Sequence, residues 1–236
     1  MDESTKGAPW RAELADITAL RRERFAVAAS VFAREMPEEA VGHMVATARE
    51  AASGPEDSAE GRLGVALAGL ACDDAAAFAT LTRTEYARLF LGPRAVVAPL
   101  HESAYRSGTS RTFTAETLAV RAFYERHGYI LKAKNREPED AIGTELEFMR
   151  NLCDGLLEAL GDGSAPFDRT AAKGFLRALG AFAEQHLDRW VARFTERVRE
   201  GDRSGFYAAW AAYLDEVLAE DAALQRESER LLGAAG

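Results

Sequence analysis

The side chains best suited to chemistry are four histidines, two cysteines and a set of scattered carboxylates. The histidines form no His-Glu-x-x-His motif and no pairs four residues apart, and no Glu-x-x-His pair of a di-iron site is present. Neither a Gly-x-Ser-x-Gly nucleophile motif nor a phosphate-binding glycine loop occurs. The histidines are His43, His101, His127 and His186. Local motifs therefore predict no conventional active site and no metal, although a site assembled from distant residues stays open.

The cysteines and one pair of closely spaced acids support the same prediction. Cys72 and Cys153 lie in apolar surroundings and lack the Cys-x-x-Cys spacing of a metal site. Buried structural thiols are typical of such positions. Glu145 and Glu147 are two positions apart, so a helix directs them to different sides.

Two segments without helical period are the most unusual feature of the chain. Residues 91–111 contain Gly92-Pro93, Pro99 and Ser107-Gly108, and residues 132–139 form a second irregular stretch. Loops of this length inside a compact domain usually have a function. These segments are therefore the first place to expect a binding surface.

Apolar periodicity predicts helices on either side of these loops. The clearest is a stripe stepping by three and four from Ile142 to Leu160, ended by Gly161-Asp162-Gly163. Thr114 is a candidate N-cap of the helix that ends at His127-Gly128. Other predicted helices cover about 14–32, 38–48, 58–71, 78–89, 175–194 with a break near His186-Leu187, and 206–217 followed by a charged tail. We expect an all-α fold, a helical bundle of roughly ten helices.

Composition sets the class of protein. The chain has 236 residues, 47% hydrophobic and 28% charged, and a net charge of −9, which disfavours nucleic acid as a partner and suits a basic partner or simple solubility. No apolar run reaches the ~18–20 residues of a membrane span, and the first residues do not resemble a secretion signal. We expect one cytoplasmic domain over 1–236, with a boundary near 128–140 if it is subdivided and a tail at 220–236 without fixed structure.

Three motifs are arranged in a fixed order along the chain. The first is Tyr-x-x-Leu-Phe-x-Gly-Pro at 86–93, the second is Pro-x-x-Glu-Ser-x-Tyr at 99–105, and the third begins at Glu137-Pro138 and leads through Asp140 into Glu-Leu-Glu-Phe-Met at 145–149. A weaker fourth match is Phe-x-x-x-His-Leu-x-x-Trp-x-x-x-Phe at 182–194. In this order and spacing, the chain resembles the TorD/DmsD/NarJ family of redox-enzyme maturation chaperones, over about residues 81–218. One difference is Ala141, where the family usually has histidine.

The resemblance implies an all-helical chaperone, not an enzyme. Such a chaperone binds the twin-arginine signal peptide, or N-terminal region, of a molybdenum oxidoreductase precursor and holds it for cofactor insertion before export. It implies no resident cofactor, although some members have been linked to weak guanine-nucleotide binding, and a monomer or a homodimer. Whether nucleotide binds here, which enzyme is the client and what Ala141 changes are not determined by the sequence.

A twin-arginine leader presents two guanidiniums and then an apolar segment, so its receptor needs carboxylates beside an apolar groove. Glu139 is a further acidic candidate. The residues we predict to bind the peptide are Tyr86, Phe90, Pro99, Glu102, Ser103, Tyr105, Tyr124, Glu137, Pro138 and Asp140.

Structural roles are the alternative for several of these residues. Asp140 could instead cap the helix that starts at Ile142, and Glu102 could hold its own loop through backbone amides. Tyr86 and Phe90, one turn apart, are more typical of a core, and His186 on an apolar stripe is typical of a hydrogen-bonded core histidine. Two rival functions are a haem-oxygenase-like helical enzyme with a buried cofactor, and a structural subunit that dimerises through Trp190 and Trp210.

Overall fold

The computed structural model describes residues 9–51, 57–70, 74–92, 96–107, 114–131, 138–161 and 166–234. These residues form helices and no strand, and therefore the predicted all-α class is confirmed. The α-helices are α1 (Pro9–Ala33), α2 (Glu38–Ala51), α3 (Ala59–Gly69), α4 (Ala75–Tyr86), α5 (Glu102–Arg106), α6 (Ala115–Arg126), α7 (Ile142–Leu160), α8 (Arg169–Phe182), α9 (Asp188–Gly201) and α10 (Phe206–Ala234). Two π-helical segments, η2 (Ala87–Leu91) and η3 (Ala183–Leu187), continue α4 and join α8 to α9.

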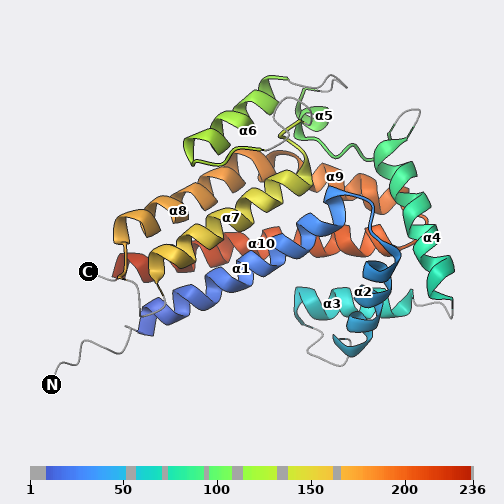
Figure 1. Cartoon of the computed structure of the whole chain (residues 1–236), viewed down its shortest axis with the longest axis horizontal. Helices are drawn as coiled ribbons and strands as arrows, with labels where there is room; N and C mark the ends of the chain where they lie inside the picture. Colours follow the sequence, from blue (N-terminus) through green and yellow to red (C-terminus); the bar gives the residue numbers. More distant parts are fainter. Residues whose placement is uncertain are drawn as a thin grey trace.

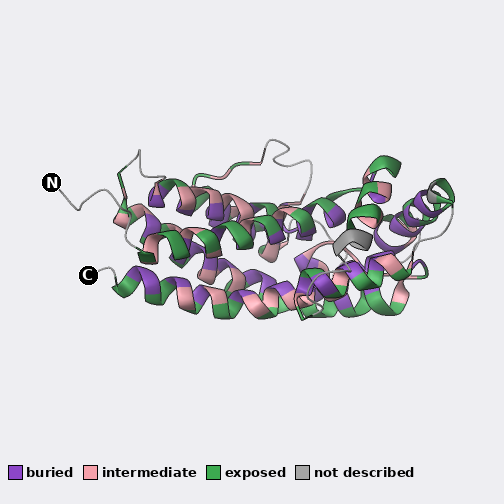
Figure 2. Ribbon diagram, turned by 90° about the horizontal axis from the view of Figure 1, so that it is seen from below, coloured by how far each residue is buried: buried purple, intermediate pink, exposed green. Residues whose placement is uncertain are grey.

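Four long helices, α1, α7, α8 and α10, run side by side and form the body of the molecule (Figure 1). Their buried residues face one another and their exposed residues face outward (Figure 2). The stripe predicted from Ile142 to Leu160 lies in this interior. Where α7 begins, a Cβ on Gly143 would lie 2.7 Å from the Cα of Ala33, so glycine allows α1 and α7 to touch.

The shorter helices cover the bundle on two sides. α5 and α6 lie above it in Figure 1, while α2 and α3 lie below, with α3 packed against α10. α3 begins as the sequence predicts, because the Ser58 side chain accepts a hydrogen bond from the Gly61 N–H at 3.0 Å. α6 also ends at its predicted position, where Gly128 has a φ of 75°.

Two predictions of irregular structure are wrong. Residues 102–106, inside the first predicted loop, form α5, and α10 continues through the predicted tail as far as Ala234. The tail is helical because its polar residues are buried against α1: Arg21 forms a bidentate ion pair with Asp221 at 2.7 and 3.0 Å. Arg21 also donates to Gln225 at 3.0 Å. A subdivision near 128–140 stays a prediction.

Candidate functional site

The two motif loops meet in the folded chain. His101 and Ala141 form an isolated antiparallel bridge. On either side of it, the Glu102 N–H donates to the Asp140 carbonyl at 2.9 Å and the Ile142 N–H donates to the Leu100 carbonyl at 2.8 Å. These bonds flank the His101–Ala141 pair, so its two side chains lie on the same side of the bridge. Segments 40 residues apart in the sequence therefore form one structural unit.

Asp140 fastens this unit from inside. Its carboxylate accepts the Ser103 N–H at 2.9 Å and the Thr117 hydroxyl at 3.0 Å, and the residue is fully buried. It therefore caps the start of α5 and ties α6 to it. The alternative prediction, that Asp140 caps α7, is wrong, because Ala141 occupies that cap position and makes no side-chain bond there.

Glu102 is held by side chains, not by the amides of its own loop. It is fully buried, and one carboxylate oxygen lies 2.9 Å from Nδ1 of His186 on η3. The other oxygen accepts from Arg106, one turn along α5. The prediction that His186 is a hydrogen-bonded core histidine is confirmed.

Glu145 belongs to the site although it is not among the residues predicted to bind the peptide. It is fully buried on α7, and one oxygen accepts the Trp190 Nε1–H at 3.1 Å. Burial raises its pKa well above the usual range, and the charges of Glu102 and Asp140 raise it further. A signal was available, because position 145 is three residues after Ile142 and four before Met149, within the apolar arc.

We call Glu102, Asp140, Glu145, His186 and Trp190 the buried polar cluster. It joins α5, α7, η3 and α9 with hydrogen bonds inside the protein. Within the described ranges, no group of three or more His, Cys, Asp or Glu side chains is arranged to hold a metal ion. The cluster is placed to fix the helices relative to one another, since buried polar groups are stable only when they are paired.

Glu139 and Tyr124 extend the same pattern to α6. Glu139 is buried and receives two hydrogen bonds from Arg121, at 2.7 and 3.0 Å. The Tyr124 hydroxyl donates to the Glu139 carbonyl at 3.1 Å, and burial raises the pKa of Tyr124 well above its usual value. Each acidic candidate among the described residues thus already has partners within the chain.

The aromatic candidates are also core residues. Tyr86 and Phe90 are 2% and 5% exposed, and Phe90 packs between Phe32, Phe194 and Tyr207 with ring centroids 5.3–6.2 Å apart. Phe90 lies on the π-helical segment η2, which directs its ring into this aromatic group. The structural alternative for Tyr86 and Phe90 is confirmed.

Tyr105 and the remaining candidates differ in exposure. Tyr105 is buried, with its ring 5.3 Å from that of Trp190 and with the guanidinium of Arg197 5.3 Å above it. Ser103 is buried as well, whereas Pro99 and Pro138 are half-buried. Glu137 lies outside the described residues. Peptide binding by this set stays a prediction, and the two prolines are its more accessible members.

His101 lies next to Ala141, the position at which the family usually has a histidine. It lies directly across the bridge from Ala141, and its Nδ1 has no hydrogen-bond partner within the described part of the chain. Burial lowers the pKa of His101, and the charge of Asp140 opposes this. The neutral ring is therefore favoured.

An open pocket of about 420 Å³ lies beside the buried polar cluster, between α6 and the η3–α9 turn. His186 and Phe123 line it, and Arg106, Arg126 and Arg189 surround them. The positive charges of these three guanidiniums would repel a peptide that itself carries arginines. We call it the arginine pocket.

Comparisons with known proteins identify the family of the chain. A family model described as the nitrate reductase delta subunit matches residues 55–196, a range that contains all four motifs. The chain is 27% identical over 127 residues to a probable Tat proofreading chaperone DmsD of Haemophilus influenzae, covering 54% of this chain and 53% of that protein. It therefore spans about half the length of that relative.

It is also 30% identical over 146 residues to a selenate reductase assembly chaperone protein of Thauera selenatis, covering 62% of this chain and 70% of that one. A crystal structure of a putative redox enzyme maturation protein from Archaeoglobus fulgidus is similar with a TM-score of 0.49 and 17% identity, covering 83% and 94% of the two chains. The chain therefore belongs to the nitrate reductase delta subunit family, and its resemblance to the TorD/DmsD/NarJ chaperones is confirmed.

Proposed function

We propose that this protein is a cytoplasmic chaperone that binds the twin-arginine signal peptide, or N-terminal region, of a molybdenum oxidoreductase precursor. It holds the precursor for cofactor insertion before export and catalyses no reaction itself. The observation that carries the proposal is the family match over 55–196. The names of two relatives, a Tat proofreading chaperone and a selenate reductase assembly chaperone, support it.

Physical features of the chain are compatible with this role. A net charge of −9 favours association with a basic leader. Among the described helices, none combines the length and apolar character needed to cross a bilayer. The most prominent motif residues are used to hold helices together, which suits a binding protein with a preformed surface. We propose no resident cofactor, and weak guanine-nucleotide binding remains part of the proposal.

Fluorescence anisotropy tests the proposal directly. Labelled leader peptides of the molybdenum-enzyme precursors encoded in the source genome are titrated with the protein. We expect at least one to bind with a Kd of about 10 µM or tighter, and a version with both arginines replaced by glutamine to bind at least about tenfold more weakly. If every leader fails to bind below about 1 mM, the proposed function is wrong.

A further inference from the structure

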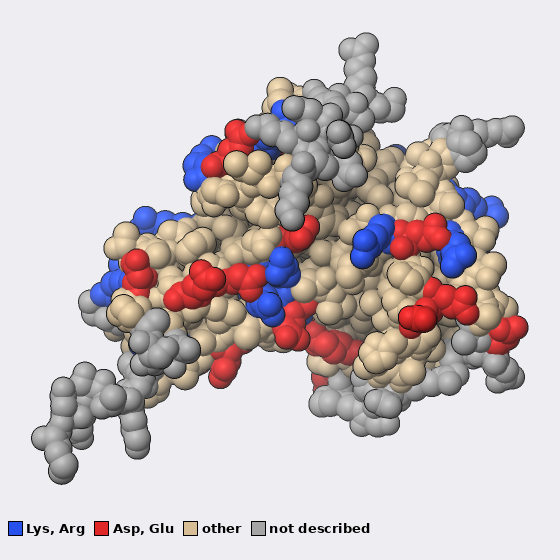
Figure 3. All heavy atoms as spheres, viewed as in Figure 1, with Lys and Arg blue, Asp and Glu red and all other residues tan. Residues whose placement is uncertain are grey.

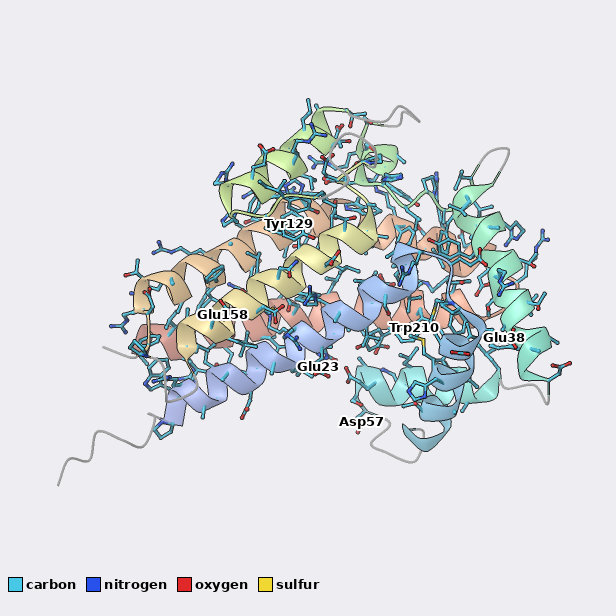
Figure 4. The ribbon with its side chains drawn as sticks, in the orientation of Figure 1. Glu23, Glu38, Asp57, Tyr129, Glu158 and Trp210 are labelled. Atoms are coloured by element: carbon cyan, nitrogen blue, oxygen red, sulfur yellow. The ribbon has the colours of Figure 1, made fainter. Side chains whose placement is uncertain are left out.

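A second open pocket lies on the side of the bundle away from the motif loops. α1, α2, α3 and α10 enclose it, with a volume of about 360 Å³. Figure 4 shows Trp210 of α10 between α1 and the α2–α3 pair. Most of the lining is apolar, and it consists of Val27, His43, Met44, Thr47, Glu60, Leu63, Gly64, Leu67, Trp210 and Tyr213. We call this the α1–α3 pocket.

Val27 and Trp210 show that the described residues do not fully cover this pocket. Val27 is 38% exposed on α1, whereas the next residue, Ala28, is fully buried in the core. Trp210 is 3% exposed, yet its Nε1–H has no hydrogen-bond partner among the described residues. Other buried atoms, such as the Tyr207 hydroxyl, also lack a partner among the described residues, so this N–H alone does not mark a binding surface. Together with the exposed Val27 it leaves an apolar hollow that the described residues do not fill.

One carboxylate lines the pocket, and two others on α10 are held by arginines of α1 and α3. Glu60 lines it and accepts hydrogen bonds from Arg24 at 2.8 and 3.1 Å. Glu220 accepts from the same guanidinium at 2.7 Å, and Glu216 holds Arg62 at 2.9 Å. In Figure 3 acidic side chains are spread over the face of the molecule, and one group of them lies at its lower edge, near the place where α1 passes α3.

Two further acids remain available on this edge. Glu23 on α1, beside Arg22, and Asp57, just before α3, are both exposed (Figure 4). With Glu60, Glu216 and Glu220 they make five carboxylates against the guanidiniums of Arg24 and Arg62, while Arg22 is paired with Asp154. The edge therefore has an excess of negative charge next to an apolar cavity.

We propose that the α1–α3 pocket receives the apolar segment of the client's twin-arginine leader. The leader's arginines then lie along the acidic edge, at Glu23 and Asp57. The proposal rests on the proposed function and gives it a location. An amphipathic or apolar segment lays its side chains in a groove between helices, and guanidinium forks pair with carboxylates. The arginine pocket near the motif loops has the opposite charge and would repel the same peptide.

A pair of matched substitutions tests the location. Val27→Lys puts a cation at the mouth of the pocket, and Val65→Lys makes the same change on α3 at a residue that is 46% exposed and does not line the pocket. Each protein is titrated with the leader that binds the native chain most tightly. We expect Val27→Lys to raise the Kd at least about tenfold and Val65→Lys to raise it less than about twofold.

Thr47→Lys provides a second variant on the opposite wall, in case Val27→Lys disturbs α1. Both sites are exposed, so melting temperatures should stay within about 2 °C of the native value. If both pocket variants bind the leader as tightly as the native chain, the location is wrong while the proposed function stands. If no leader binds the native chain, both are wrong. If the variants change only the self-association measured by sedimentation, a second copy of the chain occupies the pocket and the proposal is overturned.

Discussion

The buried polar cluster and the α1–α3 pocket differ in how their polar groups are satisfied. In the cluster, Glu102, Asp140 and Glu145 are fully buried and each accepts a hydrogen bond, and the second oxygen of Glu145 is the one carboxyl oxygen of the three without a partner among the described residues. In the pocket, the indole N–H of Trp210 has no partner among the described residues, and Val27 is partly exposed. Motif residues are thus concentrated where buried hydrogen bonds hold the helices together. The open apolar surface contains none of the residues that the motifs identify.

The largest effect should come from the aromatic part of the first motif. Phe90→Ala removes a ring packed against Phe32, Tyr86 and Tyr207. We expect it to lower the free energy of unfolding by about 3–5 kcal/mol in urea titrations. Leu91→Ala, at a neighbouring residue that is 59% exposed, should change it by less than about 0.5 kcal/mol. If Phe90→Ala were instead stable and bound the leader more weakly, the motif aromatics would contact the leader. The motif region, and not the α1–α3 pocket, would then be the binding surface.

Asp140→Ala should have the next largest effect. It leaves the buried Ser103 N–H and Thr117 hydroxyl without their acceptor, at a cost of about 2–4 kcal/mol. Thermal unfolding measures the change, and Glu147→Ala, an exposed acid on α7, serves as the control. Leader affinity of the folded fraction should be unchanged. Weaker binding with an unchanged melting temperature would instead identify Asp140 as a peptide ligand.

The sequence was sufficient for most of the helices, but not for α5 inside the first predicted loop. Periodicity located α7, because its stripe repeats without interruption from Ile142 to Leu160. It missed the last part of α10, since Asp221 and Gln225 occupy buried positions there and contact Arg21, two hundred residues away in the chain. Pairing across such a distance cannot be seen in a local pattern.

The candidate site was harder to predict for a related reason. A carboxylate in a loop looks the same in sequence whether it faces solvent or a buried partner. Glu102 is an interior residue because its partner His186, 84 positions later, is brought next to it on η3. The α1–α3 pocket gave no sequence signal at all, because its lining comes from four helices, with ordinary spacing in each.

The same substitution at two tryptophans compares the regions directly. Trp190→Phe removes the Nε1–H that donates to Glu145 at 3.1 Å, and leaving that buried oxygen unsatisfied should cost about 1–3 kcal/mol. Trp210→Phe removes an N–H that has no partner within the described ranges, and should cost less than about 1 kcal/mol. Urea denaturation of both variants gives the difference. If both variants lost the same free energy of unfolding, the two indole N–H groups would contribute equally to stability and the two regions would not differ in this respect.

Glu145→Gln should give the smallest change, and it depends on pH. Because the pKa of Glu145 is raised from 4.5 in the folded chain, the folded state binds more protons than the unfolded state between the two pKa values. The free energy of unfolding therefore falls as pH rises through that window. Glutamine keeps an oxygen for the Trp190 N–H but does not titrate.

We expect the variant to gain about 1 kcal/mol relative to the native chain at pH 8, and to show little or no gain at pH 4, where the native carboxyl is protonated in both states. Urea titrations at several pH values measure this difference, with Glu147→Gln as the exposed control on the same helix. A constant difference across the pH range would mean that Glu145 titrates normally. The buried polar cluster would then be open to solvent, and the contrast with the α1–α3 pocket would lose its physical basis.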